Sequence, residues 1–215
     1  DDLNDYYDVA LKQARLDRLT PHPNFKFAKL GIEDRPALEK TFHGFRPQRV
    51  VNLAAQAGVR YYIENPYAYV ESNLVDIINI LEACRHGKIE HLVYASSSSV
   101  YGVKDAREVA AFTEEDPCVA PASPYAATKR MNELLLSTYR DLFGLGVFAL
   151  RFFTVYGPRQ RSDMAIAMFT HSIVRGHAIP MFGDGTSRRD YTYIADIVAG
   201  IIAAVERITP NQFEL

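Results

Sequence analysis

The sequence predicts an α/β fold, a doubly wound parallel sheet joined to part of a smaller second lobe. The first observation is that short apolar runs alternate with segments of helical periodicity along most of the chain. The second is that 48% of the 215 residues are hydrophobic, which is enough to bury a core. The third is the lack of any internal repeat or low-complexity linker. This pattern is typical of parallel strands connected by helices.

Each expected element depends on a local pattern. Apolar residues that recur every three or four positions predict helices at Tyr7–Leu19, Arg35–Phe45, Pro66–His86 and Pro124–Leu142. Short apolar runs between them predict strands at Phe25–Leu30, Arg49–Leu53, His91–Ala95 and Val147–Arg151. After Gly157 the pattern indicates a helix at Met164–Arg175, a short apolar run at Ile179–Phe182 and a helix at Ala195–Arg207. Gln212–Leu215 has the character of a strand that is just beginning.

Composition excludes several classes of function. A formal net charge of −2 gives no reason to expect nucleic acid or an anionic membrane as a partner. No apolar stretch approaches the ~20 residues of a membrane span. Cys84 lies in a helical pattern and Cys118 in a Pro-rich loop, so we expect neither a disulfide nor a metal site, and we expect a reducing cytoplasm. The six histidines show no metal-ligand spacing.

Two motifs carry chemistry. Ser96–Ser99 follow the apolar run that ends at Ala95, at the carboxyl end of a predicted strand, where open α/β sheets bind ligands. Further on, Ser123 can cap a helix that begins at Pro124. That helix places Tyr125 and Lys129 four residues apart on one face. The two motifs together predict a hydroxyl, a phenol and an ammonium around one small ligand.

These residue types suit proton transfer beside a hydride carrier. A phenol has an ordinary pKa near ~10, but a lysine cation and an oxidised nicotinamide both favour its phenolate. Tyr125 is therefore the expected base, tuned by Lys129, while Ser97 hydrogen-bonds the reacting oxygen. The plainer interpretation is that serines after a strand are only turn formers or helix caps, and that a Tyr-x-x-x-Lys spacing arises by chance.

Further motifs occur in a fixed order along the chain: Asn52–Tyr61 (NLAAQAGVRY), Glu64–Pro66, Asn73, Arg151–Arg159 (RFFTVYGPR), Phe182–Gly185 and Arg189–Tyr193. With the serine run and the Tyr/Lys pair, they make the chain resemble the extended short-chain dehydrogenase/reductase family over nearly its whole length. Within that family it is most similar to the nucleotide-sugar epimerases, in particular the UDP-glucuronate 4-epimerases.

The resemblance implies a domain organisation. Residues 1–157 correspond to an NAD-binding Rossmann domain that lacks its first β-α unit, because no G-x-x-G-x-x-G phosphate turn occurs in the sequence. Residues 158–215 correspond to part of a substrate-binding region, truncated at its C-terminus. We therefore expect a fragment of a longer protein or a truncated gene product.

The resemblance also implies cofactor contacts. Asp1 matches an acidic residue that binds the adenosine ribose and favours NAD over NADP. Ala54 and Ala55 match small residues that let the cofactor approach the backbone, and Asn73 matches a helix residue on that side. Ser96, Tyr125 and Lys129 complete the expected NAD contacts. Gly31 stands where related enzymes commonly have an Asp that contacts adenine.

Ser98 and Ser99 decide the expected reaction. Sugar-nucleotide 4,6-dehydratases carry Asp-Glu at these positions, because eliminating water needs an additional acid and base. UDP-glucuronate decarboxylases carry a Glu beside the following Val. With serines there, the resemblance implies C4 epimerisation through a 4-keto sugar.

Substrate contacts are expected from residues with hydroxyl or guanidinium groups: Ser98, Ser99, Thr154, Arg161, Arg189 and Arg60. Arg161 is the candidate for the sugar carboxylate and Arg189 for the diphosphate. Ser162 stands where many relatives have a proline after the loop arginine.

The sequence leaves three functions open. The first is NAD-dependent epimerisation of UDP-glucuronate to UDP-galacturonate, and the second is the same reaction on UDP-glucose/galactose or a related UDP-sugar. The third is a catalytically silent fragment that only folds or dimerises. In each case the resemblance implies a homodimer through a four-helix bundle built from Pro66–His86 and Pro124–Leu142.

Overall fold

The computed structural model describes residues 1–58, 61–103, 111–181, 184–185 and 188–215. Their contacts divide the chain into two compact units. The smaller unit comprises Asp1–Lys29 and Phe153–Val198, and the larger unit comprises Leu30–Phe152 and Ala199–Leu215. Among the helices of this described part, none is long and apolar enough to cross a membrane. The expected division at residue 157 concerns cofactor and substrate binding, and it stays a prediction.

The larger unit is built on a four-stranded parallel sheet in the order β1-β2-β3-β6. Its strands are β1 (Val50–Asn52), β2 (His91–Ser97), β3 (Gly146–Phe152) and β6 (Phe213–Glu214). The parallel α/β fold that the sequence predicts is therefore confirmed. Because all four strands run in one direction, their carboxyl ends lie at one edge of the sheet.

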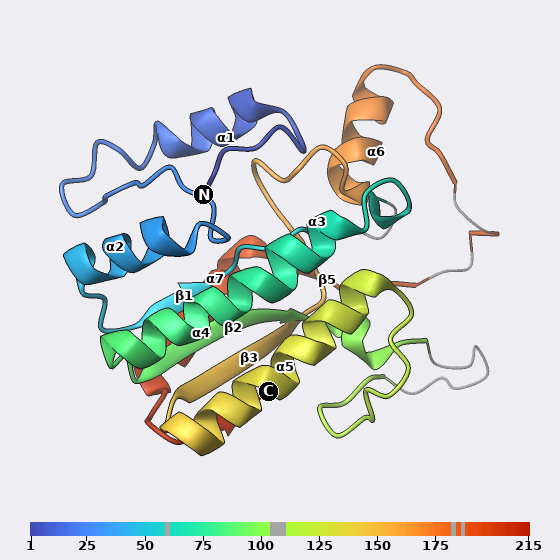
Figure 1. Cartoon of the computed structure of the whole chain (residues 1–215). Helices are drawn as coiled ribbons and strands as arrows, with labels where there is room; N and C mark the ends of the chain where they lie inside the picture. The colour runs from blue at the N-terminus through green and yellow to red at the C-terminus, as the bar shows by residue number, and fades with distance from the viewer. Residues whose placement is uncertain (59–60, 104–110, 182–183, 186–187) are drawn as a thin grey trace. The chain divides into compact units, whose positions relative to one another are not determined.

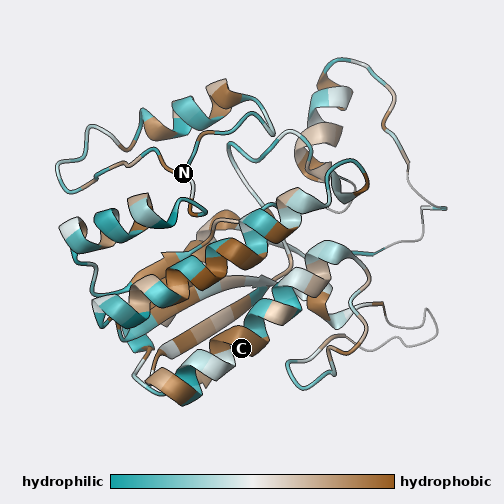
Figure 2. Ribbon diagram, in the orientation of Figure 1, coloured by the Kyte–Doolittle hydropathy of each residue, from teal (hydrophilic) through white to brown (hydrophobic). Residues whose placement is uncertain are grey.

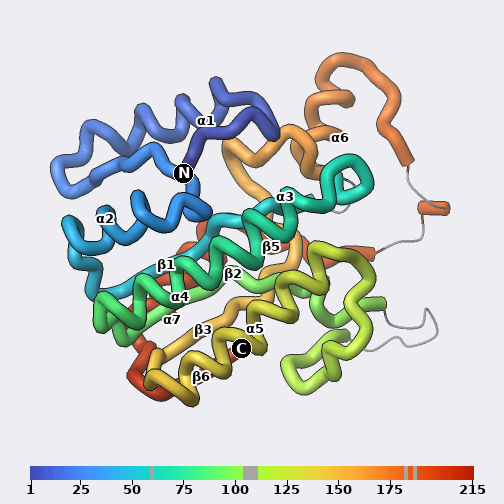
Figure 3. The backbone as a smooth tube through the Cα atoms, in the orientation of Figure 1, coloured from blue at the N-terminus to red at the C-terminus, as the bar shows by residue number. Residues whose placement is uncertain are grey.

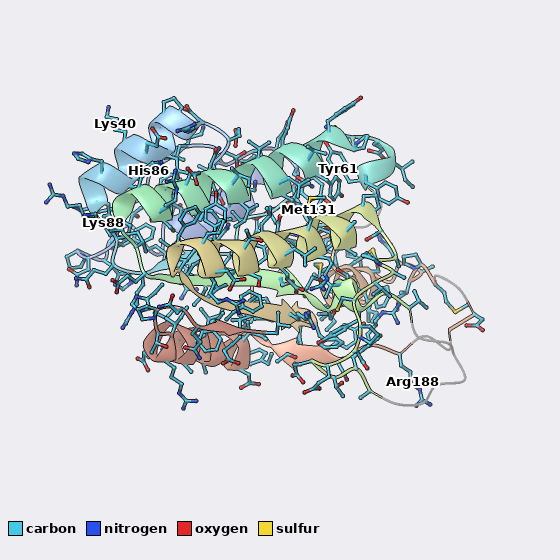
Figure 4. All side chains as sticks on the ribbon, turned by 60° about the horizontal axis from the view of Figure 1, so that its bottom comes forward. Lys40, Tyr61, His86, Lys88, Met131 and Arg188 are labelled. Atoms are coloured by element: carbon cyan, nitrogen blue, oxygen red, sulfur yellow. The ribbon has the colours of Figure 1, made fainter. Side chains whose placement is uncertain are left out.

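Helices connect these strands and cover the sheet. They are α2 (Arg35–Phe45), α3 (Tyr67–Val70), α4 (Asp76–Gly87), α5 (Pro124–Phe143) and the Ala199–Arg207 part of α7 (Ile194–Arg207). The chain passes from β2 through α5 to β3 (Figure 3), with the short helical turn η3 (Ser98–Tyr101) directly after β2. Figure 4 shows α4 and α5 side by side on one face of the sheet, with the C-terminal part of α7 on the other face.

Local signals fix the bounds of α5 as the sequence predicts. The Ser123 hydroxyl accepts a hydrogen bond from the backbone N–H of Ala126, and Pro124 occupies the first turn. The helix ends at Gly144, which adopts the left-handed conformation with φ of 73°. This start places Tyr125 and Lys129 in the first two turns of α5.

The core lies between the sheet and helices α4 and α5 (Figure 1). Leu81 of α4, Leu92 of β2 and Leu136 of α5 are fully buried. Each such side chain contributes about 2 kcal/mol through burial of its apolar surface. This packing sets the position of α5 against the strand that carries the serine run.

The expected single helix Pro66–His86 is interrupted by η2 (Glu71–Val75), a π-helical turn between α3 and α4. Asn73 lies within this turn and is buried. A π turn inserts an extra residue into the helix, and such turns are frequent at functional sites. The periodicity of apolar residues could not reveal it, because the helix continues on both sides.

The smaller unit contains α1 (Val9–Leu16), β4 (Thr154–Tyr156), α6 (Ala165–Val174) and β5 (Tyr191–Tyr193). β4 and β5 form a parallel pair in which Thr154 lies opposite Tyr191. Helix α1 begins later than the expected Tyr7–Leu19, because the Asp8 side chain accepts from the backbone N–H of Ala10 and caps the helix there, and it ends earlier, at Leu16.

One expected strand is wrong. Phe25–Leu30 runs without strand structure, although its residues suit a strand. A strand requires a hydrogen-bonded neighbour, and in the described residues the edge strand β1 pairs only with β2.

Candidate functional site

The serine run lies at the carboxyl end of β2, where the strand passes into η3. The Ser97 hydroxyl oxygen accepts hydrogen bonds from the backbone N–H of Ser99 at 3.2 Å and from its side-chain hydroxyl at 2.9 Å. Ser97 is therefore the N-cap of η3, as the plainer interpretation holds. Because both bonds use its lone pairs, the proton of Ser97 is left to donate to a ligand oxygen.

Tyr125 and Lys129 face the end of the same strand from α5. The Lys129 Nζ lies 5.8 Å from the centroid of the Tyr125 ring and donates a hydrogen bond of 2.6 Å to the carbonyl of Ala95. Tyr125 is half-buried, whereas Lys129 is only 2% exposed. The ammonium therefore lies at the residue directly before the serine run, one helical turn from Tyr125.

Burial controls the charge of Lys129. Desolvation lowers the pKa of Lys129 to about 7. The charged form is held by the Ala95 carbonyl and by the face of the Tyr94 ring, whose centroid is 4.7 Å from Nζ. An ammonium has three N–H donors, and the structure gives one hydrogen bond for it among the described residues. Two donors therefore remain for a ligand.

Asn73 ties the loop after β1 to α5. Its Oδ1 accepts from the backbone N–H of Gln56 at 2.9 Å, and its Nδ2 donates to the Gln56 carbonyl at 3.1 Å and to the Thr128 hydroxyl at 3.0 Å. The Thr128 hydroxyl in turn donates to the carbonyl of Tyr125 at 2.8 Å. The buried Asn73 amide is thus linked through the Thr128 hydroxyl to the backbone carbonyl of the predicted base. Its expected cofactor contact stays a prediction.

Ala54 and Ala55 lie on the same loop, directly beyond β1. Ala54 is exposed and Ala55 half-buried, and the Ala54 N–H donates to the Asn52 side chain at 3.1 Å. Because Asn52 pairs in register with Tyr94 of β2, this loop and the serine run share one edge of the sheet. The contact of Ala54 and Ala55 with the cofactor, which the resemblance implies, stays a prediction.

Two further residues of this region, Glu133 and Arg151, were not expected at the site from the sequence. The buried Glu133 carboxylate accepts from the Ser96 hydroxyl at 2.6 Å and from both Nε and Nη2 of Arg151. The Ser96 hydroxyl, expected at the cofactor, is therefore already engaged with the protein. One signal was present: Tyr125, Lys129 and Glu133 recur every four residues on one helix face.

The remaining expected residues are not among the described residues of the larger unit. Asp1, Thr154, Arg161 and Arg189 belong to the smaller unit, and Arg60 lies outside the described residues. The exposed Asp1 carboxylate accepts from the Leu3 N–H, and Arg189 donates to the Arg188 carbonyl. The roles of these residues at NAD or substrate stay predictions.

Arg161 has partners within its own unit. Its Nε and Nη2 donate to the Asp163 carboxylate at 3.0 and 3.1 Å, and its guanidinium carbon lies 5.8 Å from the centroid of the Tyr6 ring. A bidentate fork of this kind has the geometry that recognises a carboxylate. Asp163 thus takes both of these Arg161 N–H groups, and the expected contact of Arg161 with a substrate carboxylate stays a prediction.

A nicotinamide cofactor fits the edge that β1, β2 and α5 share. The unused donors of Lys129, the half-buried Tyr125 and the small side chains of Ala54 and Ala55 suit a ribose and a planar ring close to the backbone. Over the described ranges, no cluster of three or more His, Cys, Asp or Glu side chains could hold a metal ion. At the edge that β1, β2 and α5 share, the side chains of Ser97, Tyr125 and Lys129 provide proton donors and acceptors.

Known proteins with the same architecture carry such a cofactor. A UDP-glucuronic acid 4-epimerase from Bacillus cereus, solved in complex with UDP-glucuronic acid and NAD, is 35% identical and superposes with a TM-score of 0.84 over 95% of this chain and 63% of its own. A dTDP-glucose 4,6-dehydratase from Streptomyces venezuelae, solved with NAD, is 26% identical with a TM-score of 0.85 and is covered to 61%, against 94% of this chain. The same fold therefore occurs in a sugar-nucleotide 4-epimerase and in a sugar-nucleotide 4,6-dehydratase.

Sequence comparison gives a relative and the family. The UDP-glucuronate 4-epimerase of Thermodesulfobacterium geofontis is 45% identical over 206 residues, which is 96% of this chain and 62% of that protein. The chain thus spans less than two thirds of the length of this relative. The sequence model of the NAD dependent epimerase/dehydratase family matches residues 6–215. The chain therefore belongs to the NAD dependent epimerase/dehydratase family.

Proposed function

We propose that this chain carries the catalytic centre of an NAD-dependent UDP-glucuronate 4-epimerase, which interconverts UDP-glucuronate and UDP-galacturonate. One observation carries the proposal: Lys129, one helical turn from Tyr125, is bonded to the residue directly before the serine run. This bond supports a site in which a phenol, an ammonium and a serine hydroxyl act on one ligand oxygen. The epimerases at 35% and 45% identity support the substrate class.

Each residue has a distinct part in the reaction. NAD supplies the acceptor and donor of the hydride at C4 of the sugar. Tyr125 takes the proton of the 4-hydroxyl as C4 is oxidised, and it returns that proton after the 4-keto sugar has presented its other face. The ammonium of Lys129 stabilises the phenolate, and Ser97 donates a hydrogen bond to the reacting oxygen.

Ser98 and Ser99 favour epimerisation over dehydration. Both are half-buried at the start of η3, and a neutral hydroxyl is neither the acid nor the base that loss of water requires. Since a dehydratase has the same fold, we assign the choice between epimerisation and dehydration to the side chains of Ser98 and Ser99.

We propose Arg161 as the group that binds the uronate carboxylate, with Thr154, Arg60 and Arg189 as further substrate contacts. The support is its bidentate pair with Asp163, because a substrate carboxylate would take over the same two N–H groups. Neutral sugars lack this group, so Arg161 would determine preference for the uronate.

We further propose a homodimer that buries the outer faces of α4 and α5. Apolar residues are exposed there at helical spacing, Val75 and Ile78 along η2 and α4, and Met131 and Leu134 on α5. Figure 2 shows such hydrophobic positions among hydrophilic ones along both helices, and α4 contacts α5. A second copy that presents the same two helices completes a four-helix bundle.

We place the protein in the cytoplasm, which suits the free thiols of Cys84 and Cys118.

The test uses the intact protein that contains this chain. We expect it to convert UDP-glucuronate labelled with deuterium at C4 into UDP-galacturonate that keeps the label, because the hydride returns to the carbon it left. Liquid chromatography with mass spectrometry measures both products and label. UDP-glucose and UDP-galactose serve as alternative substrates. Turnover of these with none of UDP-glucuronate would contradict the proposed substrate, and no turnover of any UDP-sugar would favour a silent fragment.

A further inference from the structure

A buried ion pair joins the segments that carry the site. Glu133 lies on α5 one turn after Lys129 and is 1% exposed, and the side chain of its partner Arg151, on β3, is 6% exposed. Neither residue has a part in the reaction as proposed above. We call Ser96, Glu133 and Arg151 the Glu133 cluster.

The carboxylate of Glu133 is fully engaged. Oε1 accepts from the Ser96 hydroxyl at 2.6 Å and from Arg151 Nε at 2.9 Å. Oε2 accepts from Arg151 Nη2 at 3.0 Å and from Arg130 Nη1 at 2.9 Å. The Arg151 fork is bidentate, which fixes orientation as well as distance. The cluster therefore leaves Glu133 little freedom to rotate.

The other side of Arg151 reaches the segment after β2. Its Nη1 donates to the Glu114 carbonyl at 3.3 Å, and its guanidinium carbon lies 4.9 Å from the centroid of the Tyr101 ring. Tyr101, the last residue of η3, stacks on Phe112 at 4.9 Å between ring centroids. Arg151 thus holds the end of η3 as well as α5.

The hydrogen bonds of the Glu133 cluster keep the Glu133 carboxylate ionised. Burial alone would raise the pKa of Glu133, but the hydrogen bonds from Arg151 and Ser96 outweigh it, and the pKa is lowered. Glu133 therefore stays ionised, as a strong acceptor for Ser96. A buried ion pair is often no more stabilising than apolar residues of the same size. Stabilisation of the fold alone therefore does not explain a buried ion pair between Glu133 and Arg151.

The spacing of two contacts defines what the cluster does. Lys129 and Glu133 are one helical turn apart on α5, a rise of about 6 Å. They bind Ala95 and Ser96, adjacent residues on β2, the first through its carbonyl and the second through its hydroxyl. Two attachments at adjacent residues fix both the height and the rotation of the strand end against the helix. The next residue along β2 is Ser97.

We propose that Glu133 and Arg151 are positioning residues for the epimerase reaction, holding Ser96 against α5 so that Ser97, Tyr125 and Lys129 address one substrate oxygen. This inference rests on the proposed function. Neither residue touches the reacting atoms. Both act through the strand end that carries Ser97.

The test compares Glu133→Gln and Ser96→Ala with the native protein. Gln keeps the shape of Glu133 but weakens the bonds from Arg151 and Ser96. We expect kcat for UDP-glucuronate to fall about 10- to 100-fold, since displacements of ~1 Å can cost that much. For Glu133→Gln we expect KM and the amount of bound NAD to change less than about twofold, because Glu133 is not among the groups proposed to bind NAD or substrate. Ser96→Thr, which keeps the hydroxyl, restores kcat.

The double variant separates positioning from general damage. If both residues act through their mutual hydrogen bond, Ser96→Ala adds little to the loss already caused by Glu133→Gln. Hydrogen exchange of the cofactor-free protein gives a readout independent of activity. We expect faster exchange in the peptide that spans Ser96–Tyr101 for both single variants.

Glu82→Gln is the matched control. Glu82, on α4, also accepts from an arginine and a hydroxyl, Arg85 and Tyr139, but these lie on the C-terminal halves of α4 and α5. We expect it to leave kcat and the exchange of Ser96–Tyr101 unchanged. Native kcat in Glu133→Gln and Ser96→Ala, together with an inactive Tyr125→Phe, would overturn the positioning role and leave the proposed function intact. Native protein that turns over no UDP-sugar would overturn both.

Discussion

Lys129 donates a hydrogen bond of 2.6 Å to the carbonyl of Ala95, so the ammonium that faces the Tyr125 phenol is anchored to the strand that carries the serine run. The Asn73 amide fixes the other side of the helix start, through Thr128 and the Tyr125 carbonyl. The predicted base is thereby held by contacts to two segments far apart in the sequence. Preorganisation of this kind is what proton transfer at a fixed position requires.

Replacing Tyr125 by Phe removes only the hydroxyl. We expect turnover of UDP-glucuronate to fall by at least about 100-fold, the usual contribution of general acid–base catalysis. We expect the bound NAD to be unchanged, because Lys129 keeps its contact with Ala95 and retains two N–H donors. Rates come from product analysis, and NAD content from the absorbance of protein-free extracts. A Phe variant with near-native rate would show that another group is the base.

Replacing Lys129 by Met tests the buried cation through stability. The pKa of Lys129 is about 7 in the folded protein and about 10.5 in the unfolded chain. Between these values the unfolded chain binds more protons, so the free energy of unfolding rises with pH by up to about 1.4 kcal/mol per pH unit from this group. We expect urea unfolding of the cofactor-free protein to show this rise from pH 7 to 9, and Lys129→Met to lack it.

The matched control for that measurement is Lys40→Met. Lys40 is exposed on α2 (Figure 4), so its removal should leave the pH dependence of the native protein in place. Equal pH dependence in the native protein and in Lys129→Met would contradict the assigned burial effect.

Glu82 gives a pH dependence of the same sign at lower pH, because its pKa is also lowered in the folded protein. Hydrogen bonds from Arg85 and then from Tyr139 lower the pKa of Glu82 to about 2, against 4.5 for an ordinary glutamate. Its contribution to stability is therefore present above pH 4.5 and is lost as the pH falls toward 2. Because the pair is partly exposed to solvent, we expect Glu82→Gln to cost only about 1 kcal/mol at pH 7. Chemical unfolding at pH 7 and pH 3 measures the difference, which should shrink at the lower pH.

The exposed Glu71, one π turn before α4, provides the comparison. Glu71→Gln should change the free energy of unfolding by less than about 0.5 kcal/mol at either pH. A cost for Glu82→Gln that grows on acidification would show that the assigned pKa direction is wrong.

Much of the fold could be predicted because its signals are local. Ser123 and Pro124 fix the start of α5, and the apolar run after His91 fixes β2. Strand pairing is not local, so the apolar character of Phe25–Leu30 predicted a strand for which the described chain offers no pairing. The π turn at Asn73 could not be predicted for a similar reason, since the hydrogen bond between Asn73 and Gln56 forms only in the tertiary structure.

The site divides in the same way. Tyr125 and Lys129 could be paired from their spacing, because four residues make one helical turn. Glu133 and Arg151 could not, because they lie on different elements and meet only when β3 packs against α5. A charged residue at the core-facing position of an amphipathic helix was the available hint, since such residues are rarely buried without a partner.

The apolar residues on α4 and α5 lead to a prediction about assembly. Leu134 is 55% exposed on α5, three residues after Met131, which Figure 4 labels on the same helix. If a second copy covers this face, Leu134→Glu buries two carboxylates against one another across a two-fold axis, and we expect the dimer to dissociate at micromolar concentration. Light scattering after size-exclusion chromatography measures the mass. Ile202→Glu, at a 52% exposed position of α7 on the opposite face of the sheet, should leave the dimer intact. A native protein that is monomeric would exclude the second copy. A dimer that dissociates only with Ile202→Glu would place the second copy against another face.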